Sequence, residues 1–144
     1  MLNQPTFIGI GAMRTGTSFV YMCLQQHPDI HMSTPKECNY FDKEPEYPLE
    51  QYNAKFVTTK KFAGEISPTY LYIDGTAERI KEALGDVKIF VILRNPIDRA
   101  WSHYYFMKSI AAGVNSEHTM PTSFHHALLL EPMNIRINPH AYGS

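Results

Sequence analysis

Apolar segments that alternate with helical patterns constrain the fold of this 144-residue chain more than any other feature. The apolar segments are residues 6–10, 62–67 and 88–93 (TFIGI, FAGEIS and KIFVIL). The third is continuous and rich in β-branched residues, which is typical of a strand buried on both faces. Strands that alternate with helices predict an α/β fold, in which helices flank a parallel β-sheet.

Four helices are expected between and after these strands. In the first, Phe19, Met22 and Cys23 lie at helical spacing and share one face. Asp74 and Asn95 are good N-capping residues for the second and third helices. The predicted spans are residues 15–26, 74–84, 95–110 and 123–130.

A glycine-rich turn joins the first strand to the first helix. Its sequence is GIGAMRTGTS, in which Gly11 and Gly16 permit a tight turn. In this position, backbone N–H groups and a helix N-terminus face toward an anion. Arg14 adds a planar fork of donors, and Thr17 and Ser18 add hydroxyl groups. We interpret the turn as a phosphate-binding loop; the alternative is a connection that binds no ligand.

The spacing of the two glycines matches the Walker A motif GxxxxGK[ST], but Thr17 stands where that motif has lysine. The Walker lysine binds the β- and γ-phosphates, and the hydroxyl that follows it binds Mg²⁺. The absence of this lysine disfavours a nucleoside triphosphate. A donor with one 5′-phosphate that carries a sulfuryl group needs less positive charge and no metal.

A second candidate phosphate contact follows the third apolar segment. The strand delivers Arg94 to its C-terminal end, where open parallel sheets bind their ligands. Ser102 lies about two turns into the next helix, so that it and Arg94 could grip one phosphate together. The sequence supports equally well an alternative in which Arg94 pairs with Asp98 at the surface.

With both segments in view, the chain resembles the family of PAPS-dependent sulfotransferases (PAPS is 3′-phosphoadenosine-5′-phosphosulfate), especially its heparan-sulfate-type and bacterial branches. The glycine-rich turn resembles the family's 5′-phosphosulfate loop, and the segment from Lys88 to Ser102 resembles its 3′-phosphate motif. Between them, KECNYFD at residues 36–42 is similar to K-E-x-x-[FY]-F-D, and GEISPTY at residues 64–70 is similar to G-E-[KAI]-[ST]-P-x-Y.

The resemblance implies roles for single residues. Glu37 falls where carbohydrate sulfotransferases place the general base, and a carboxylate can accept the proton of an attacking hydroxyl. Without the surrounding motifs, Glu37 would be interpreted as a solvated charge in a loop. Arg94 and Ser102 would bind the 3′-phosphate. The 5′-phosphosulfate would be held by Arg14, Thr15, Gly16, Thr17 and Ser18, with Arg14 also acting as the main electrostatic stabiliser.

The chain departs from the family pattern in three ways. Arg14 replaces a lysine that many members carry, and Ile66 replaces a lysine of the heparan-type enzymes. The chain is also short for the family. We therefore expect one sulfotransferase-like domain over residues 1–144 that lacks the usual C-terminal half, with a homodimer as one way to cover exposed sheet.

Composition limits the partners. A net charge of −1 does not favour binding to nucleic acid or to a membrane surface, and no segment approaches the roughly 20 apolar residues of a membrane helix. Two cysteines, Cys23 and Cys38, do not form a disulfide framework, which favours a reducing compartment and predicts a cytoplasmic protein. The seven histidines show no ligand spacing, so that no metal is expected.

Three functions follow from the sequence. The first is a sulfotransferase that transfers the sulfuryl group of PAPS to a hydroxyl or amine of a small-molecule or carbohydrate acceptor and releases PAP (3′-phosphoadenosine-5′-phosphate). The second is a truncated domain that binds PAPS or PAP without catalysis. The third is a phosphate-loop kinase of small substrates, which Thr17 in place of the Walker lysine disfavours.

Overall fold

The computed structural model describes residues 1–113, 121 and 123–137 of the chain. They form two compact units, Met1–Leu93 and Arg94–Ser144. The first unit contains a four-stranded parallel sheet in the order β2-β3-β1-β4. Its strands are β1 (Phe7–Gly9), β2 (Ile30–Met32), β3 (Phe62–Ile66) and β4 (Lys88–Phe90).

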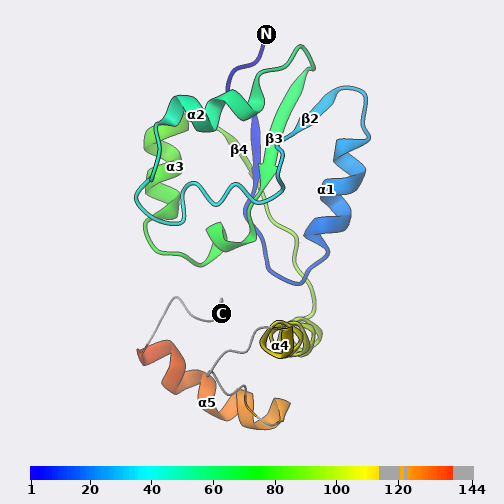
Figure 1. The fold of residues 1–144 in the computed structure, drawn as a ribbon, viewed down its shortest axis with the longest axis vertical. Helices are drawn as coiled ribbons and strands as arrows, with labels where there is room; N and C mark the ends of the chain where they lie inside the picture. Colours follow the sequence, from blue (N-terminus) through cyan, green and yellow to red (C-terminus); the bar gives the residue numbers. More distant parts are fainter. Residues whose placement is uncertain (114–120, 122, 138–144) are drawn as a thin grey trace. The chain divides into compact units, whose positions relative to one another are not determined.

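The sheet is flanked by helices on both faces, which confirms the predicted α/β class. Helix α1 (Thr17–Gln25) covers one face, and α2 (Leu49–Asn53) and α3 (Thr76–Leu84) cover the other (Figure 1). Two 3₁₀ helices, η1 (Ala54–Phe56) and η2 (Pro68–Leu71), flank β3 along the chain. The strand β2 was not predicted, because it has only three residues and a histidine at its centre.

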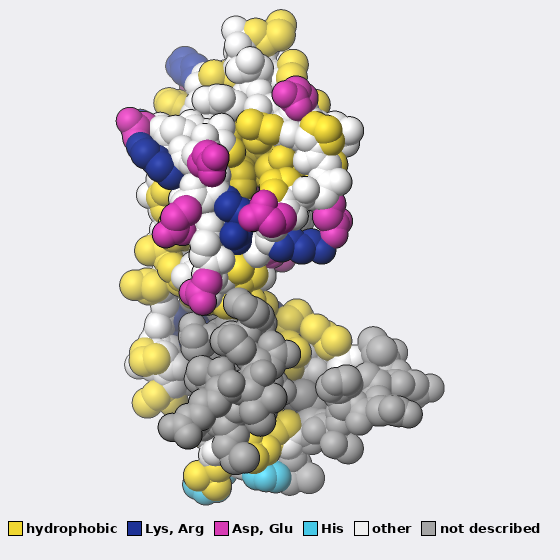
Figure 2. Space-filling model, turned by 90° about the vertical axis from the view of Figure 1, so that its left-hand side faces the viewer, with side chains coloured by type: hydrophobic (Ala, Val, Ile, Leu, Met, Phe, Trp, Pro, Cys, Tyr) yellow, Lys and Arg dark blue, Asp and Glu magenta, His cyan; other side chains and the backbone are white. Residues whose placement is uncertain are grey.

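Side chains that alternate along the strands divide the core into two layers. On the α1 face, Tyr21, Met32 and Ile66 form a small buried cluster. The α2 and α3 face carries a larger one in which aromatic rings predominate, and Figure 2 views the molecule from this side, where charged side chains border an apolar area. The buried residues of this second cluster are Ile8, Tyr40, Phe41, Tyr52, Phe56, Ala63, Tyr70, Ile80 and Leu84.

The third apolar segment is not buried on both faces, and this prediction was wrong. Strand β4 lies at the edge of the sheet, where it pairs with β1 only among the described residues. Ile89, Val91 and Leu93 are therefore 48%, 42% and 74% exposed. A continuous apolar pattern shows that a strand is suited to a sheet interior, but it does not supply the neighbour that would cover it.

Helix α1 is shorter than predicted and turns a different face inward. It begins at Thr17, with Gly16 as its N-cap in the left-handed conformation, and buries Thr17 and Tyr21. The Tyr21 hydroxyl donates a hydrogen bond of 2.7 Å to the Ser33 carbonyl. Phe19 and Met22, which belong to the apolar face expected from the sequence, are 69% and 53% exposed.

The other predicted helices are present with shifted ends. Gly75 rather than Asp74 is the N-cap of α3, and Gly85, at φ 69°, ends that helix as the sequence predicts. In the second unit, α4 spans Pro96–Gly113 and α5 spans Phe124–Ile137. The Asn95 side chain accepts hydrogen bonds from the amides of Ile97 and Asp98, so that it caps α4 as predicted.

Candidate functional site

Three segments of the first unit meet at the carboxyl end of its sheet. Strands β1 and β3 are parallel neighbours, so the loop after Gly9 and the segment after Ile66 leave the sheet on the same side. The two segments approach closely there. A methyl group added at Gly11 would lie only 2.9 Å from the Pro68 carbonyl oxygen. The Tyr72 hydroxyl also donates to the Met13 sulfur at 3.6 Å.

The glycine-rich loop takes its shape mainly from its backbone. Gly11 and Gly16 have φ angles of 143° and 93°, and Arg14 is also left-handed at 65°. The Thr15 hydroxyl donates to the Ala12 carbonyl at 2.7 Å and closes the turn. The first bond within α1 runs from the Val20 amide to the Gly16 carbonyl, so the amides before Val20 have no carbonyl one turn earlier in the helix.

Exposure separates the predicted ligands of this loop. Arg14, Gly16 and Ser18 are exposed, Thr15 is half-buried, and Thr17 is buried. The exposed members combine a positive charge, a hydroxyl group and the N-terminus of a helix. Each of these favours an anion, as expected of a phosphate-binding loop.

Glu37 lies in the second segment, which follows β2. The Lys36 ammonium group donates to the Glu37 carboxylate, and the two side chains are 17% and 41% exposed. Glu37 and Asn39 have left-handed φ angles of 65° and 50°, a conformation that asparagine tolerates but that costs a residue such as glutamate about 1–2 kcal/mol. Surrounding contacts must therefore hold this segment in place.

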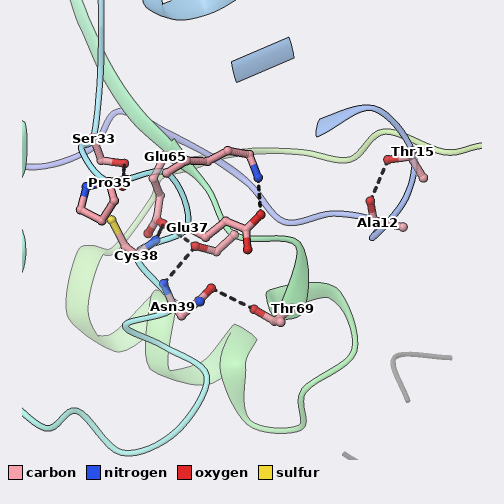
Figure 3. A network of polar contacts seen from close by, with 11 residues as sticks. Ala12, Thr15, Ser33, Pro35, Glu37, Cys38, Asn39, Glu65 and Thr69 are labelled. Atoms are coloured by element: carbon pink, nitrogen blue, oxygen red, sulfur yellow. Dashed lines mark hydrogen bonds and ion pairs between the residues drawn. The ribbon is translucent and has the colours of Figure 1, made fainter. Parts of the chain in front are cut away.

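Those contacts come from the segment after β3 (Figure 3). The Asn39 amide donates to the Ser67 hydroxyl at 3.1 Å, and the Thr69 hydroxyl donates to the Asn39 side-chain oxygen at 3.3 Å. Because the glycine-rich loop also touches Pro68, the three segments form one connected surface. The structure thus brings the predicted ligands at residues 14–18 and Glu37 to the same end of the sheet.

A fully buried carboxylate, Glu65, lies beneath the Glu37 segment and was not predicted as a site residue. It projects from β3 and accepts hydrogen bonds from two tyrosines, a serine and a backbone amide. A charged residue within an otherwise apolar strand was the signal available in the sequence, because buried Glu is rare unless it is paired.

Burial raises the pKa of the acidic groups around this carboxylate. The pKa of the Cys38 thiol rises to about 12, first through burial and then through the charge of Glu65. The same two causes raise the pKa of Tyr52 and Tyr70. These groups therefore keep their protons at neutral pH, and both tyrosine hydroxyls serve as donors to Glu65.

Arg94 and Ser102 belong to the second unit. Arg94 is exposed and immediately precedes the capping residue Asn95, whereas Ser102 is half-buried in the second turn of α4. Their joint binding of a phosphate stays a prediction.

A cavity of about 460 Å³ lies elsewhere, between α3 and β4. Its lining is mainly apolar and includes Ile10, Tyr70, Ile80, Val87 and Ile89, none of which is a predicted ligand. Among the residues that the structure describes, there is neither a cluster of side chains suited to a metal ion nor a helix long and apolar enough to span a membrane.

The fold and the loop define a class: parallel α/β proteins in which the first strand leads through a glycine-rich turn into a helix. A family model described as the sulfotransferase domain matches residues 4–137. The chain belongs to this sulfotransferase family.

Individual relatives agree with this assignment. The membrane-associated sulfotransferase kil1 of Dictyostelium discoideum is 35% identical over 74% of this chain and 24% of that protein. The mouse bifunctional heparan sulfate N-deacetylase/N-sulfotransferase 4 is 30% identical over 74% of this chain and 13% of its own length. The crystal structure of a sulfotransferase from Alicyclobacillus acidocaldarius matches with a TM-score of 0.76 and 33% identity, over 93% of this chain and 59% of that one.

The match confirms the predicted family and fold. The chain spans less than a third of these two curated relatives and somewhat more than half of the bacterial structure. Sulfuryl transfer is the activity of the family as a whole.

Proposed function

We propose that this chain transfers the sulfuryl group of PAPS to a hydroxyl or amine of an acceptor. The observation that carries the proposal is the loop at residues 11–18, a glycine-rich turn with an exposed Arg14 at a helix N-terminus and Thr17 in place of the Walker lysine. Such a loop suits a 5′-phosphosulfate, which needs neither the Walker lysine nor a metal ion to bind.

The proposed roles are those that the resemblance to the family implies. Arg14, Thr15, Gly16, Thr17 and Ser18 hold the 5′-phosphosulfate, and Arg94 with Ser102 holds the 3′-phosphate. Because the 3′-phosphate ligands lie in the second unit, the proposal needs both units to act as the single domain 1–144. Its support is that the matched family region, residues 4–137, extends over both.

Glu37 is the proposed general base. The acceptor oxygen or nitrogen attacks sulfur in line, its proton passes to the Glu37 carboxylate, and the bond from sulfur to the 5′-phosphate oxygen breaks to release PAP. Arg14 stabilises the charge that develops on the bridging oxygen, which leaves with PAP, and on the equatorial oxygens of the sulfuryl group. Arg14 is a poor proton donor because the guanidinium group stays charged, so its contribution is electrostatic.

A carbohydrate is the acceptor that the comparisons favour, because the mouse relative is named for heparan sulfate. A small-molecule acceptor is the second candidate. We further propose a cytoplasmic location on the basis of the free cysteines Cys23 and Cys38, and a homodimer that covers the exposed edge at β4.

A PAPS- or PAP-binding domain without turnover is the alternative function, since the chain spans only part of its relatives. A thermal-shift titration with PAP, repeated on Arg94→Ala, tests binding of the second phosphate. Transfer of ³⁵S from PAPS to a panel of N-desulfated heparin, small phenols and tyrosine peptides then separates enzyme from binder. Stabilisation by Mg²⁺-ATP with none by PAP would instead support a kinase.

A further inference from the structure

We infer that Glu65 is a positioning residue that holds Glu37 in place for proton transfer. The inference rests on the proposed function, in which Glu37 is the general base. Glu65 itself is fully buried and has no access to an acceptor, so that it acts through the segment it binds.

The Glu65 carboxylate is surrounded by four donors. Its Oε1 atom accepts from the Tyr52 hydroxyl at 2.7 Å and the Tyr70 hydroxyl at 3.1 Å. Its Oε2 atom accepts from the Ser67 hydroxyl at 2.6 Å and the Cys38 amide at 3.2 Å. Four donors match the acceptor capacity of an ionised carboxylate, which is what allows a charge to be buried here.

Three backbone amides that follow Glu37 are held by this carboxylate. The Cys38 amide binds it directly. The Asn39 amide donates to the Ser67 hydroxyl, which itself donates to Glu65. The Phe41 amide donates to the Tyr70 hydroxyl at 3.4 Å, and that hydroxyl also donates to Glu65.

The geometry of the segment explains why it needs such a hold. Glu37 and Asn39 both have left-handed φ angles, which asparagine adopts readily but glutamate adopts mainly where surrounding contacts impose them. The amide directly after Glu37 is bound to Glu65, and the amides of Asn39 and Phe41 are bound to hydroxyls that donate to Glu65. A side chain that could accept from only some of these donors would release part of the segment.

Glu65→Gln is the direct test because it keeps the volume and removes the charge. Its amide group would face two of the four donors, so we expect faster hydrogen exchange at residues 38–41 and a turnover number at least about tenfold lower. PAP affinity should stay within about twofold, because the four donors described around Glu65 come from residues 38, 52, 67 and 70 and not from the glycine-rich loop.

Two further variants keep the test decisive if Glu65→Gln does not fold. Ser67→Ala removes a hydroxyl that also accepts from the Asn39 amide, whereas Tyr52→Phe removes only a hydroxyl that donates to Glu65 and keeps the ring that packs on Tyr40 and Phe41. We expect Ser67→Ala to speed exchange at Asn39 and lower turnover, and Tyr52→Phe to do neither. Equal effects of the two variants would overturn the inference.

A double-mutant cycle separates failure of this inference from failure of the proposed function. With the best acceptor of the panel, Glu65→Gln should slow the parent but add little to Glu37→Gln, because both act through the same base. Multiplicative losses, or full turnover in Glu65→Gln, would overturn the positioning role alone. A parent without sulfuryl transfer, or Glu37→Gln at full rate, would overturn the proposed function and the positioning role with it.

Discussion

The glycine-rich loop and the Glu37 segment lie at the same end of the sheet but are built in opposite ways. The loop at residues 11–18 takes its shape from backbone φ angles, one short turn contact and the backbone hydrogen bonds that join Gly11 and Ala12 to Ile92. The Glu37 segment contains no glycine and is held by side chains of β3 and the residues after it. The loop is thus shaped through its backbone, whereas the Glu37 segment depends on side chains about thirty positions away along the chain.

This difference suggests that the loop serves mainly in binding and the Glu37 segment mainly in catalysis. A backbone cradle can bind the same phosphate group in many related proteins, since it uses groups that every residue has. A base must be placed to within a fraction of an ångström, which a side-chain network on a rigid strand achieves better than a loop alone. Variants of the two regions should therefore separate binding from turnover.

The largest effect is expected at Glu37. Glu37→Gln should lower the turnover number by about 10²–10⁴-fold, the usual contribution of a general base, with PAP affinity nearly unchanged. Glu44→Gln removes an exposed carboxylate from the same irregular region and serves as the matched control. Steady-state transfer of ³⁵S measures both; equal rates for the two variants would remove Glu37 from the mechanism.

The glycine-rich loop should respond mainly in binding. Gly11→Ala places a methyl group 2.9 Å from the Pro68 carbonyl and 3.1 Å from the Leu71 Cβ, and neither neighbour can move without the backbone. We expect a loss of about 2 kcal/mol in stability and about tenfold in PAP affinity.

Gly16→Ala is the matched control for this loop. Its methyl group would meet nothing within 4 Å, so that only the φ angle of 93° opposes it, at about 1 kcal/mol. Denaturant unfolding of both variants measures the difference in stability, since Gly16 is itself a proposed ligand of the 5′-phosphosulfate. A larger effect at Gly16 than at Gly11 would contradict the close contact between the loop and η2.

The smallest effect is expected at Asp42, at the end of the Glu37 segment. Burial raises the pKa of this half-buried carboxyl, against the opposing effects of a Thr69 hydrogen bond and Arg79. Its Oδ1 atom is buried without a hydrogen-bond partner among the described residues. The folded chain therefore keeps the Asp42 proton at a pH where the unfolded chain has lost it, and stability falls as pH rises above about 4.

Asp42→Asn removes the ionisable group and with it this loss of stability at higher pH. The variant should be more stable than the parent near pH 7, by less than about 1 kcal/mol because solvent screens the half-buried group. The advantage should disappear as the pH falls to about 4. Melting temperatures across this range check the sign, and an advantage that grows toward low pH would show that the raised pKa is wrong.

The same contrast explains what could be predicted from the sequence. The strand, the two glycines and the helix of the loop are contiguous, so local rules predicted the turn and the α/β class. The Glu65 network joins residues 38, 39 and 41 to residues 65, 67 and 70, and one sequence carries no sign of such pairings. Glu37 was reached through a resemblance in motif rather than through its contacts.

The errors in the prediction share one cause: the pattern within an element does not reveal which other elements pack against it. The apolar pattern of residues 88–93 predicts a strand correctly but not its place at the sheet edge. In α1, helical spacing is compatible with several buried faces. The face that is buried contains Tyr21, whose hydroxyl donates a hydrogen bond to the Ser33 carbonyl. Both features depend on tertiary packing, which overrides local pattern.

Calorimetric titration with PAP tests the central claim most directly, because the cradle at residues 11–18 must bind the 5′-phosphate for any of the chemistry to follow. We predict a single saturable site in the parent, weakened at least about tenfold in Arg14→Ala and unchanged in Lys81→Ala, which removes an exposed cation of α3. Absence of binding at millimolar PAP, or equal affinity in the parent and Arg14→Ala, would contradict the account.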